Sequence, residues 1–134
     1  MSLKINCRKI VGGNGRGKAL VTKQTINFLA MVDTKRGAIN DRNHELFGKD
    51  MKDIVLIFPN AVGSSVGAYT IYSLKVNGVA PVAIVSINKA DIITASGCAI
   101  SNIPFVDMLE TSISFLKSGL EISVDADKQI IIII

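Results

Sequence analysis

A chain of 134 residues and 14.3 kDa can bury one hydrophobic core but is too short for two ordinary domains, so we expect a single domain over residues 1–134. Its residues are 49% hydrophobic, but no apolar run approaches the roughly 18 residues of a membrane span. No apolar run of signal-peptide length follows the first charged residues either. We therefore expect a cytoplasmic protein without a membrane partner. The net charge of +4 comes from scattered basic residues, and with only two tyrosines and five phenylalanines for base stacking it favours a generic anionic ligand over nucleic acid.

The first residues predict strands around a glycine-rich turn. Residues 4–10 alternate in the manner of one half-exposed strand, and Gly12–Gly17 supplies a flexible turn. The next segment, residues 19–22, is strand-like where a dinucleotide-binding fingerprint requires a helix, so we reject a Rossmann-type site. We expect a simple hairpin connection here, and a loop that wraps a substrate with Asn14 and Arg16 as donors remains open.

A polar region follows the apolar stretch of residues 26–32. The segment Asp33–Asn40 predicts a turn in which Asp33 hydrogen-bonds back to the chain and Gly37 is free to take a positive φ. Residues 41–52 contain His44, the only histidine. A lone histidine in a loop is usually structural or solvated, so we expect no catalytic role for it.

The centre of the chain predicts a strand-helix-strand unit. Ile54–Phe58 has the apolar character of a buried strand, a stripe from Ala68 to Val76 predicts a helix that stops at Asn77–Gly78, and residues 79–85 predict a second strand. Such a crossover implies parallel strands and a right-handed connection, so the expected fold class is α/β.

The turn between that strand and helix is the candidate site. Ligands gather at the carboxyl ends of strands in α/β proteins, and the first turn of a helix attracts anions through its free N–H groups and its dipole. Gly63 and Gly67 let the backbone approach a ligand, and Ser64 and Ser65 can each cap the helix or reach outward. The alternative is a plain strand-turn-helix joint with a serine N-cap.

The end of the chain predicts a second helix, a short strand and a hairpin. Residues 91–100 have helical spacing up to a break near Asn102, and residues 103–107 predict the strand. Residues 120–134 alternate, turn tightly and finish in five isoleucines, which predicts a C-terminal β-hairpin. Because a free edge of isoleucines would aggregate, we expect it to be covered on both faces or paired with another subunit.

The two cysteines, Cys7 and Cys98, lie far apart and have no Cys-x-x-Cys or histidine partner nearby. Neither a zinc site nor an iron–sulfur cluster can therefore be assembled from cysteine ligands within this chain. We expect both to be reduced core thiols, and any such cofactor must come from elsewhere.

Taken together, the motifs resemble the small, swivelling-domain subunit of aconitase-X-type dehydratases over nearly the full length. The central match is Ile57–Pro59 followed by Gly63–Ser65. The other matching segments, in order, are Gly15–Val21, Ile26–Leu29 with Val32–Asp33, the loop from Gly37 through His44 to Gly48, Gly78–Ile84, Ile103–Asp107 and Val124–Asp127.

The resemblance implies a swivelling β/β/α domain of the aconitase type that closes on a large subunit, which holds an iron–sulfur cluster (4Fe-4S). It also implies that the small subunit supplies a serine base, Ser64 by its place after Gly63, with Ser65 and neighbouring N–H groups as contacts for a phosphorylated hydroxy acid. The implied reaction is dehydration of (R)-5-phosphomevalonate to trans-anhydromevalonate 5-phosphate in archaeal isoprenoid biosynthesis, a hydro-lyase activity that requires both subunits.

Two positions beside the serines depart from the family pattern. Family members usually carry an arginine before Gly-Ser-Ser and a threonine after it, whereas this chain has Val62 and Val66. An anion clamp lost there has to be replaced by Arg16, by Lys18 or by a cation of the large subunit. The alternatives are the small subunit of a cis-3-hydroxy-L-proline dehydratase and a non-catalytic swivel-domain binding module.

Overall fold

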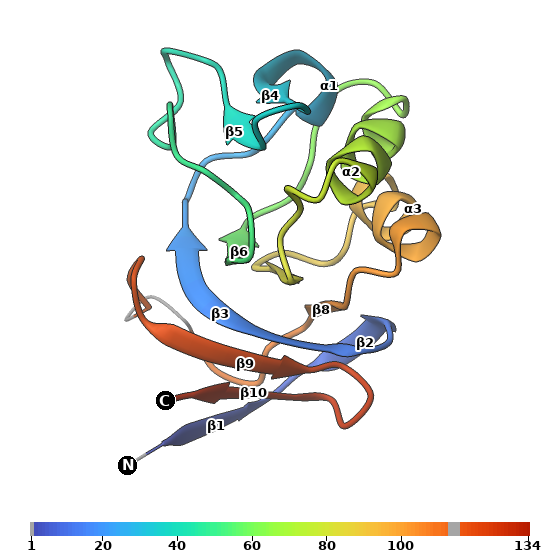
Figure 1. Ribbon diagram of the computed structural model, residues 1–134. Helices are drawn as coiled ribbons and strands as arrows, with labels where there is room; N and C mark the ends of the chain where they lie inside the picture. Colours follow the sequence, from blue (N-terminus) through green and yellow to red (C-terminus); the bar gives the residue numbers. More distant parts are fainter. Residues whose placement is uncertain (1, 113–115) are drawn as a thin grey trace.

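A computed structural model describes residues 2–112 and 116–134 (Figure 1). Within these residues the strands form one large mixed sheet, in the order β1-β10-β9-β3-β6-β7-β8-β2, and a two-stranded ribbon, β4-β5. The large sheet contains β1 (Leu3–Asn6), β2 (Arg8–Val11), β3 (Asn14–Val21), β6 (Val55–Phe58), β7 (Ala83–Ser86), β8 (Phe105–Asp107), β9 (Glu121–Asp125) and β10 (Ile130–Ile133). The ribbon pairs β4 (Val32–Asp33) with β5 (Ala38–Ile39), and the helices are α1 (Phe28–Met31), α2 (Gly67–Val76) and α3 (Ile92–Ser101). None of these helices has the length and apolar character needed to cross a membrane.

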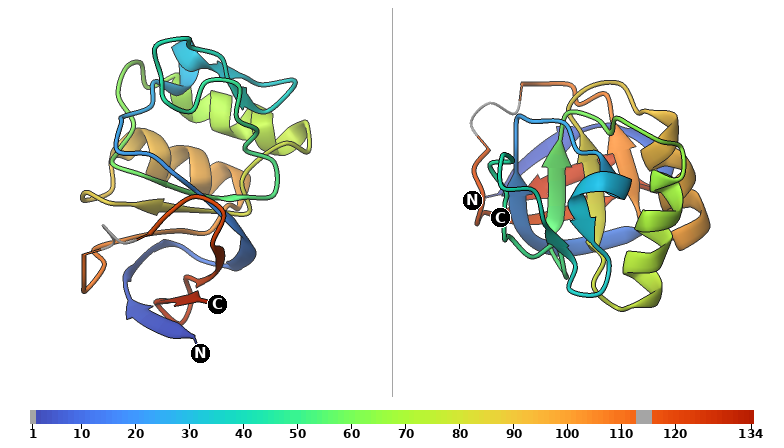
Figure 2. Two further views of the ribbon diagram at one scale, coloured as in Figure 1. Left: turned by 90° about the vertical axis from the view of Figure 1, so that its left-hand side faces the viewer. Right: turned by 90° about the horizontal axis from the view of Figure 1, so that it is seen from above.

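Three layers form because the parallel strands β3, β6, β7 and β8 send alternate side chains into two cores. Leu56 of β6 belongs to the core that also contains Ile71 of α2. Its neighbour Val55 belongs to the other core, with Val124 of β9 and Ile131 of β10. Figure 2 shows α2 and α3 on one side of the parallel strands and β9, β10 and β1 on the other. The α/β class and the β/β/α layering expected from the sequence are confirmed.

Strand β3 belongs to both β layers. Its residues 19–21 pair in parallel with β6, and its residues 14–18 pair antiparallel with β9. The flexible turn and hairpin expected at Gly12–Gly17 are therefore wrong, because the strand already runs through Gly15. A Cβ at Gly15 would lie 3.2 Å from Val82 Cβ and closer still to the Val82 carbonyl, so glycine permits a close approach between backbones.

The N-terminal segment forms two strands instead of the one expected over residues 4–10. β1 pairs with β10, and β2 pairs with β8 at the opposite edge of the sheet. The change of partner falls at Cys7, whose N–H donates to Gln129 O at 3.0 Å. Alternation predicts extended backbone, but it carries no information about which strand each half will pair with.

The strand-helix-strand unit and the turn at Asp33 are confirmed, although the second strand begins at Ala83 instead of residue 79. β6 and β7 pair in parallel and are connected through α2, whose C-cap is Asn77 and is followed by Gly78 at a φ of +72°. Asp33 Oδ1 accepts two N–H groups of the next turn, at 3.0 and 3.2 Å, and Gly37 there has a φ of +78°. These predictions succeeded because capping and turn chemistry depend on residues close in sequence.

The terminal isoleucines lie inside the sheet. β10 pairs with β9 on one side and with β1 on the other, so the expected hairpin is confirmed and β1 of the same chain covers its edge. Ile131 is 1% exposed, whereas Ile134 is 51% exposed. No second subunit is needed to pair this strand.

We therefore expect Ile131→Ala to lower the free energy of unfolding by about 2–5 kcal/mol, because it leaves a cavity between the β layers. Ile134→Ala is the matched control and should change this energy by no more than about 0.5 kcal/mol. Urea unfolding followed by circular dichroism measures both. Equal effects of the two substitutions would contradict the placement of β10 in the core.

Candidate active site

The loop after β6 is held against the segment that precedes α1. Ile26 and Ala61 form a parallel bridge, and Val62 N–H donates to Ile26 O at 3.0 Å. The rings of Phe28 and Phe58 meet edge to face with their centroids 5.9 Å apart. These contacts fix the loop at the carboxyl end of a parallel strand, the place where α/β proteins bind ligands.

Asp91 holds the same loop from the side of α3. Its Oδ1 accepts the N–H of Ala61 at 2.9 Å, and its Oδ2 accepts the N–H of Thr94 at 2.8 Å, which caps the helix. The sequence predicted a helix start at Asp91. The contact with Ala61 was missed, because it joins residues that only the fold brings together.

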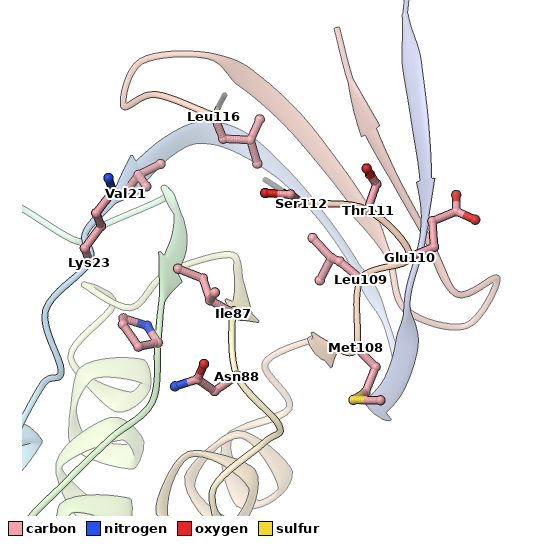
Figure 3. Close-up of a pocket in the computed structure, with 11 residues that line it drawn as sticks. Val21, Lys23, Ile87, Asn88, Met108, Leu109, Glu110, Thr111, Ser112 and Leu116 are labelled. Atoms are coloured by element: carbon pink, nitrogen blue, oxygen red, sulfur yellow. The ribbon is translucent and has the colours of Figure 1, made fainter. Parts of the chain in front are cut away.

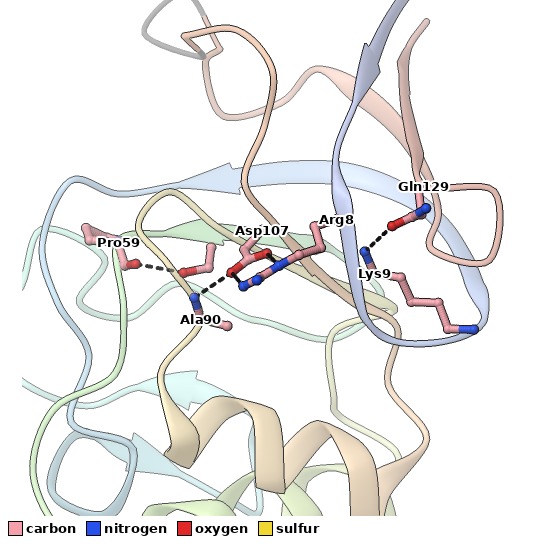
Figure 4. A network of polar contacts seen from close by, with 7 residues as sticks. Arg8, Lys9, Pro59, Ala90, Asp107 and Gln129 are labelled. Atoms are coloured by element: carbon pink, nitrogen blue, oxygen red, sulfur yellow. Dashed lines mark hydrogen bonds and ion pairs between the residues drawn. The ribbon is translucent and has the colours of Figure 1, made fainter.

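An ion pair between a buried carboxylate and a partly exposed arginine supports the segment that leads into α3 (Figure 4). Asp107 is 0% exposed, and its carboxylate accepts Arg8 Nε at 2.8 Å and Arg8 Nη2 at 2.7 Å. The same carboxylate accepts the N–H of Ala90 at 2.6 Å. A buried carboxylate is stable only with several such donors. The pair thereby connects edge strand β2 to the residue before Asp91.

Gly63 is required both by its backbone conformation and by a neighbour. Its φ is +91°, a region that residues with a Cβ rarely adopt. A Cβ built there would lie 2.5 Å from Asn27 Cγ and 2.7 Å from Asn27 Oδ1, and nearer still to Nδ2. The side-chain amide of Asn27 therefore lies directly against the Cα of Gly63. Sequence reasoning did not single out Asn27.

Ser64 and Ser65 precede the first turn of α2, and both are exposed. The helix starts at Gly67 and its N-cap is Val66, which makes no side-chain cap, so the serine N-cap that the alternative interpretation required is wrong. Ser64 instead closes the preceding turn, since its Oγ accepts Val66 N–H at 3.1 Å and its carbonyl accepts Gly67 N–H at 2.9 Å. In the part of the chain that the structure describes, the N–H groups of Gly63, Ser64 and Ser65 have no acceptor. Three donors are thus available at the positive end of α2.

Arg16 lies away from these residues. It is in register with Ser123 of β9, and its Nε lies 3.3 Å from Glu121 Oε2. In the parallel pairing of β3 with β6 it precedes the amino end of β6, whereas Ser64 follows the carboxyl end. The structure does not bring Arg16 together with Gly63–Ser65, so its assignment to substrate binding stays a prediction that this placement does not favour.

His44 has a structural environment. It is 6% exposed, its Nε2 donates to Thr25 O at 3.1 Å, and its Nδ1 accepts Leu46 N–H at 3.0 Å. Both ring nitrogens are thus used to hold the loop between β5 and β6, as expected for a lone loop histidine.

A hollow of about 770 Å³ opens at the carboxyl ends of the parallel strands (Figure 3). Its side chains come from the end of β3, from the start of the serine loop and from the segments after β7 and β8, and Ser64 is not among them. Lys23 is the one cationic side chain among the described residues that line it. The carboxylate of Glu110 accepts hydrogen bonds from the backbone N–H and the side-chain amide of Asn6. The lining residues are Val21, Lys23, Pro59, Ile87, Asn88, Met108, Leu109, Glu110, Thr111, Ser112 and Leu116.

Exposed apolar side chains lie in the serine loop and near the starts of α1 and α3, which contact this loop. Val62 and Val66 flank the serines and are 39% and 48% exposed. Leu29 of α1 is 50% exposed, and Ile92 at the start of α3 is 79% exposed. We call these four residues the apolar collar. Apolar groups gathered around free polar donors are typical of a surface that another protein covers.

The chain is similar over nearly its whole length to known proteins. Residues 4–133 match the family model described as the aconitase X swivel domain. The phosphomevalonate dehydratase small subunit of Thermococcus sibiricus is 46% identical over 126 residues, which cover 94% of this chain and 95% of the relative. That of Methanothrix thermoacetophila is 40% identical over 131 residues, covering 98% and 95%. The crystal structure of Thermococcus kodakaraensis aconitase X in its holo-form superposes with a TM-score of 0.92, at 39% identity and with 98% of each chain covered.

The two free cysteines do not fit a metal or iron–sulfur centre. Among the residues described, no three histidine, cysteine or acidic side chains gather where they could hold a metal ion. Burial, together with the charge of Asp107, raises the pKa of Cys7 to about 11. Burial and the charge of Asp91 raise the pKa of the Cys98 thiol still more strongly. Since thiolates are the ligands of metals and clusters, both environments oppose such a role.

We expect alkylation of folded Cys7 by iodoacetamide to accelerate about tenfold per pH unit and to keep rising above pH 9, because only the thiolate reacts and its pKa is raised to about 11. The guanidine-unfolded chain, with an ordinary thiol pKa near 8.5, should level off earlier. Cys7→Ser, in which the buried Cys98 remains, is the control for site assignment. A rate plateau near pH 9 in the folded protein would contradict the raised pKa.

Proposed function

Because the chain belongs to the aconitase X swivel-domain family, we propose that it is the small subunit of a two-chain hydro-lyase that dehydrates (R)-5-phosphomevalonate to trans-anhydromevalonate 5-phosphate. The observation that carries the proposal is the Gly63–Ser65 loop. It presents a hydroxyl and three free N–H groups at the carboxyl end of β6, in a chain that is 46% identical to a relative named for this reaction.

Ser64 is the base of the proposed reaction. A serine hydroxyl at its free pKa is too weakly acidic to be ionised, so the alkoxide needs hydrogen-bond donors and positive potential. Ser64 Oγ accepts Val66 N–H at 3.1 Å and stands ahead of the N-terminus of α2, and both features favour the negative form. The base removes the proton α to the substrate carboxylate.

The free N–H groups of Gly63, Ser64 and Ser65 bind the anionic substrate, and the Ser65 hydroxyl donates to it. Val62 and Val66 supply no charge to this loop, so a cation outside the loop has to bind the phosphate of the substrate. Lys23 in the neighbouring hollow is one such cation on this chain. A side chain of the large subunit can provide another.

The large subunit covers the loop in this proposal. Water around an exposed serine would screen the donors, whereas a partner seated on the apolar collar would exclude it and strengthen every electrostatic interaction inside. The large subunit also holds the iron–sulfur cluster, because the raised pKa of Cys7 and of Cys98 makes this chain unsuitable as a source of thiolate ligands. We place the enzyme in the cytoplasm.

One observation favours a second candidate. The two valines beside the serines replace the arginine and threonine of the usual pattern, which suits a substrate without a phosphate, such as cis-3-hydroxy-L-proline. A subunit that binds the partner but has lost catalysis would show the same replacement.

Reconstitution tests these proposals. We expect this chain, combined anaerobically with the large subunit from the same genome, to dehydrate phosphomevalonate, and we expect neither chain alone to do so, because each contributes only half of the site. Product formation followed by mass spectrometry measures the activity. Turnover by this chain alone in metal-free buffer would overturn the two-subunit proposal. Turnover of cis-3-hydroxy-L-proline but not of phosphomevalonate would select the second candidate.

We expect Ser64→Ala to lower kcat by at least about 10²-fold in the assembled enzyme, since it removes the base. The loss of stability should not exceed about 2 kcal/mol, because the exposed hydroxyl accepts a single backbone hydrogen bond. Ser65→Ala is the matched control and should mainly raise KM. Near-normal turnover in the assembled Ser64→Ala enzyme, with an inactive Ser65→Ala enzyme, would show that Ser65 and not Ser64 is the base.

A further inference from the structure

Asn27 has one end of its side-chain amide fixed and the other end free. Its Oδ1 accepts the N–H of Ala30 at 3.1 Å, which caps α1 and determines which end of the amide carries the nitrogen. The side chain is half-buried, and within residues 2–112 and 116–134 no acceptor binds its Nδ2. Two oriented N–H donors are therefore left without a protein partner.

These donors lie beside the residue that precedes the proposed base. The close contact of the amide with the Cα of Gly63 places Nδ2 against the serine loop. The contact is rigid, because the pairing of Ile26 with Ala61 and Val62 fixes the two segments relative to each other. An oriented donor against the loop that carries the base can stabilise the negative charge that develops on a substrate bound there.

Capping alone does not need an asparagine. Aspartate and serine cap helices about as well, and their oxygens would accept the N–H of Ala30 in the same way. Aspartate would place its own negative charge against the free N–H groups of Gly63–Ser65, where it would compete with a bound anion. Serine would remove the N–H donors of the amide. The amide is therefore the one of these three groups that caps α1 and also donates toward an anion.

We propose that the side-chain amide of Asn27 donates a hydrogen bond to the substrate carboxylate. This inference rests on the proposed function. As Ser64 removes the α proton, the electron pair of the broken C–H bond moves toward the carboxylate, which gains negative charge. A donor fixed at this point interacts more strongly with the transition state than with the bound substrate and so acts on kcat.

Two substitutions separate this role from capping. In the reconstituted complex, Asn27→Ser should lower kcat by roughly 10- to 10²-fold and change KM by less than about threefold. Asn27→Asp should lower kcat by at least about 10²-fold and also raise KM, because its charge repels the substrate carboxylate. Both variants should keep the wild-type melting temperature and assemble normally. Asn43→Asp is the control, since it makes the same change of charge on an exposed side chain of the loop between β5 and β6.

The results discriminate between the possible roles. Retention of kcat within about twofold in both folded, assembled variants would overturn the inference and leave Asn27 as a cap. If Asn27→Asp does not assemble, Asn27→Ser decides the question alone. If the wild-type complex does not dehydrate phosphomevalonate, the proposed function fails. The effect of Asn27 is then measured on the hydroxy acid that the complex does dehydrate, so the two failures are distinguishable.

Discussion

The double pairing of strand β3 is the constraint on which the rest of the structure depends. One end of the strand pairs with β9 and the other with β6, so the two β layers are a single sheet that turns over on itself. The turn requires close backbone contacts, and the absence of a Cβ at Gly15 permits one of them, against Val82. Where β3 ends, the chain continues to Ile26 and pairs with the serine loop. The same strand thus organises the core, and the segment that follows it places Asn27 beside the serine loop.

Local chemistry made much of this fold predictable. The helix stop at Asn77–Gly78, the turn at Asp33 and the C-terminal hairpin depend on residues within a few positions of one another, and all are found. The failures concern the choice of partner. Residues 4–10 have one alternating pattern, yet they supply two strands to opposite edges of the sheet. The packing of the whole chain decides which edge of the sheet a strand joins, and an alternating pattern does not specify that edge.

The candidate site, like the fold, was predictable where its residues are close in sequence and not where they meet through the fold. Gly63, Ser64 and Ser65 are contiguous, and the expected strand and helix on either side indicated where they would lie. Asp91 was predicted to start a helix, but its hydrogen bond to the loop at Ala61 was not, and Asn27 was not singled out although it caps α1. Both act on this loop through tertiary contacts. Arg16 was named as a donor in a glycine-rich loop, but residues 14–17 belong to strand β3, whose pairing with β9 places Arg16 away from the serines.

The arrangement explains why a subunit of this kind would be inert alone. Its free N–H groups and its serine hydroxyl belong to one exposed loop, where water competes for the donors and screens their charge, and the apolar collar that could exclude this water is exposed as well. The loop itself is held in place by Asp91 at the start of α3 and by the segment before α1, through the pairing with Ile26 and the close contact of Asn27. A partner that covers the loop would therefore need to remove water without reshaping the site. Preorganised donors that become effective only on closure confine the chemistry to the assembled enzyme.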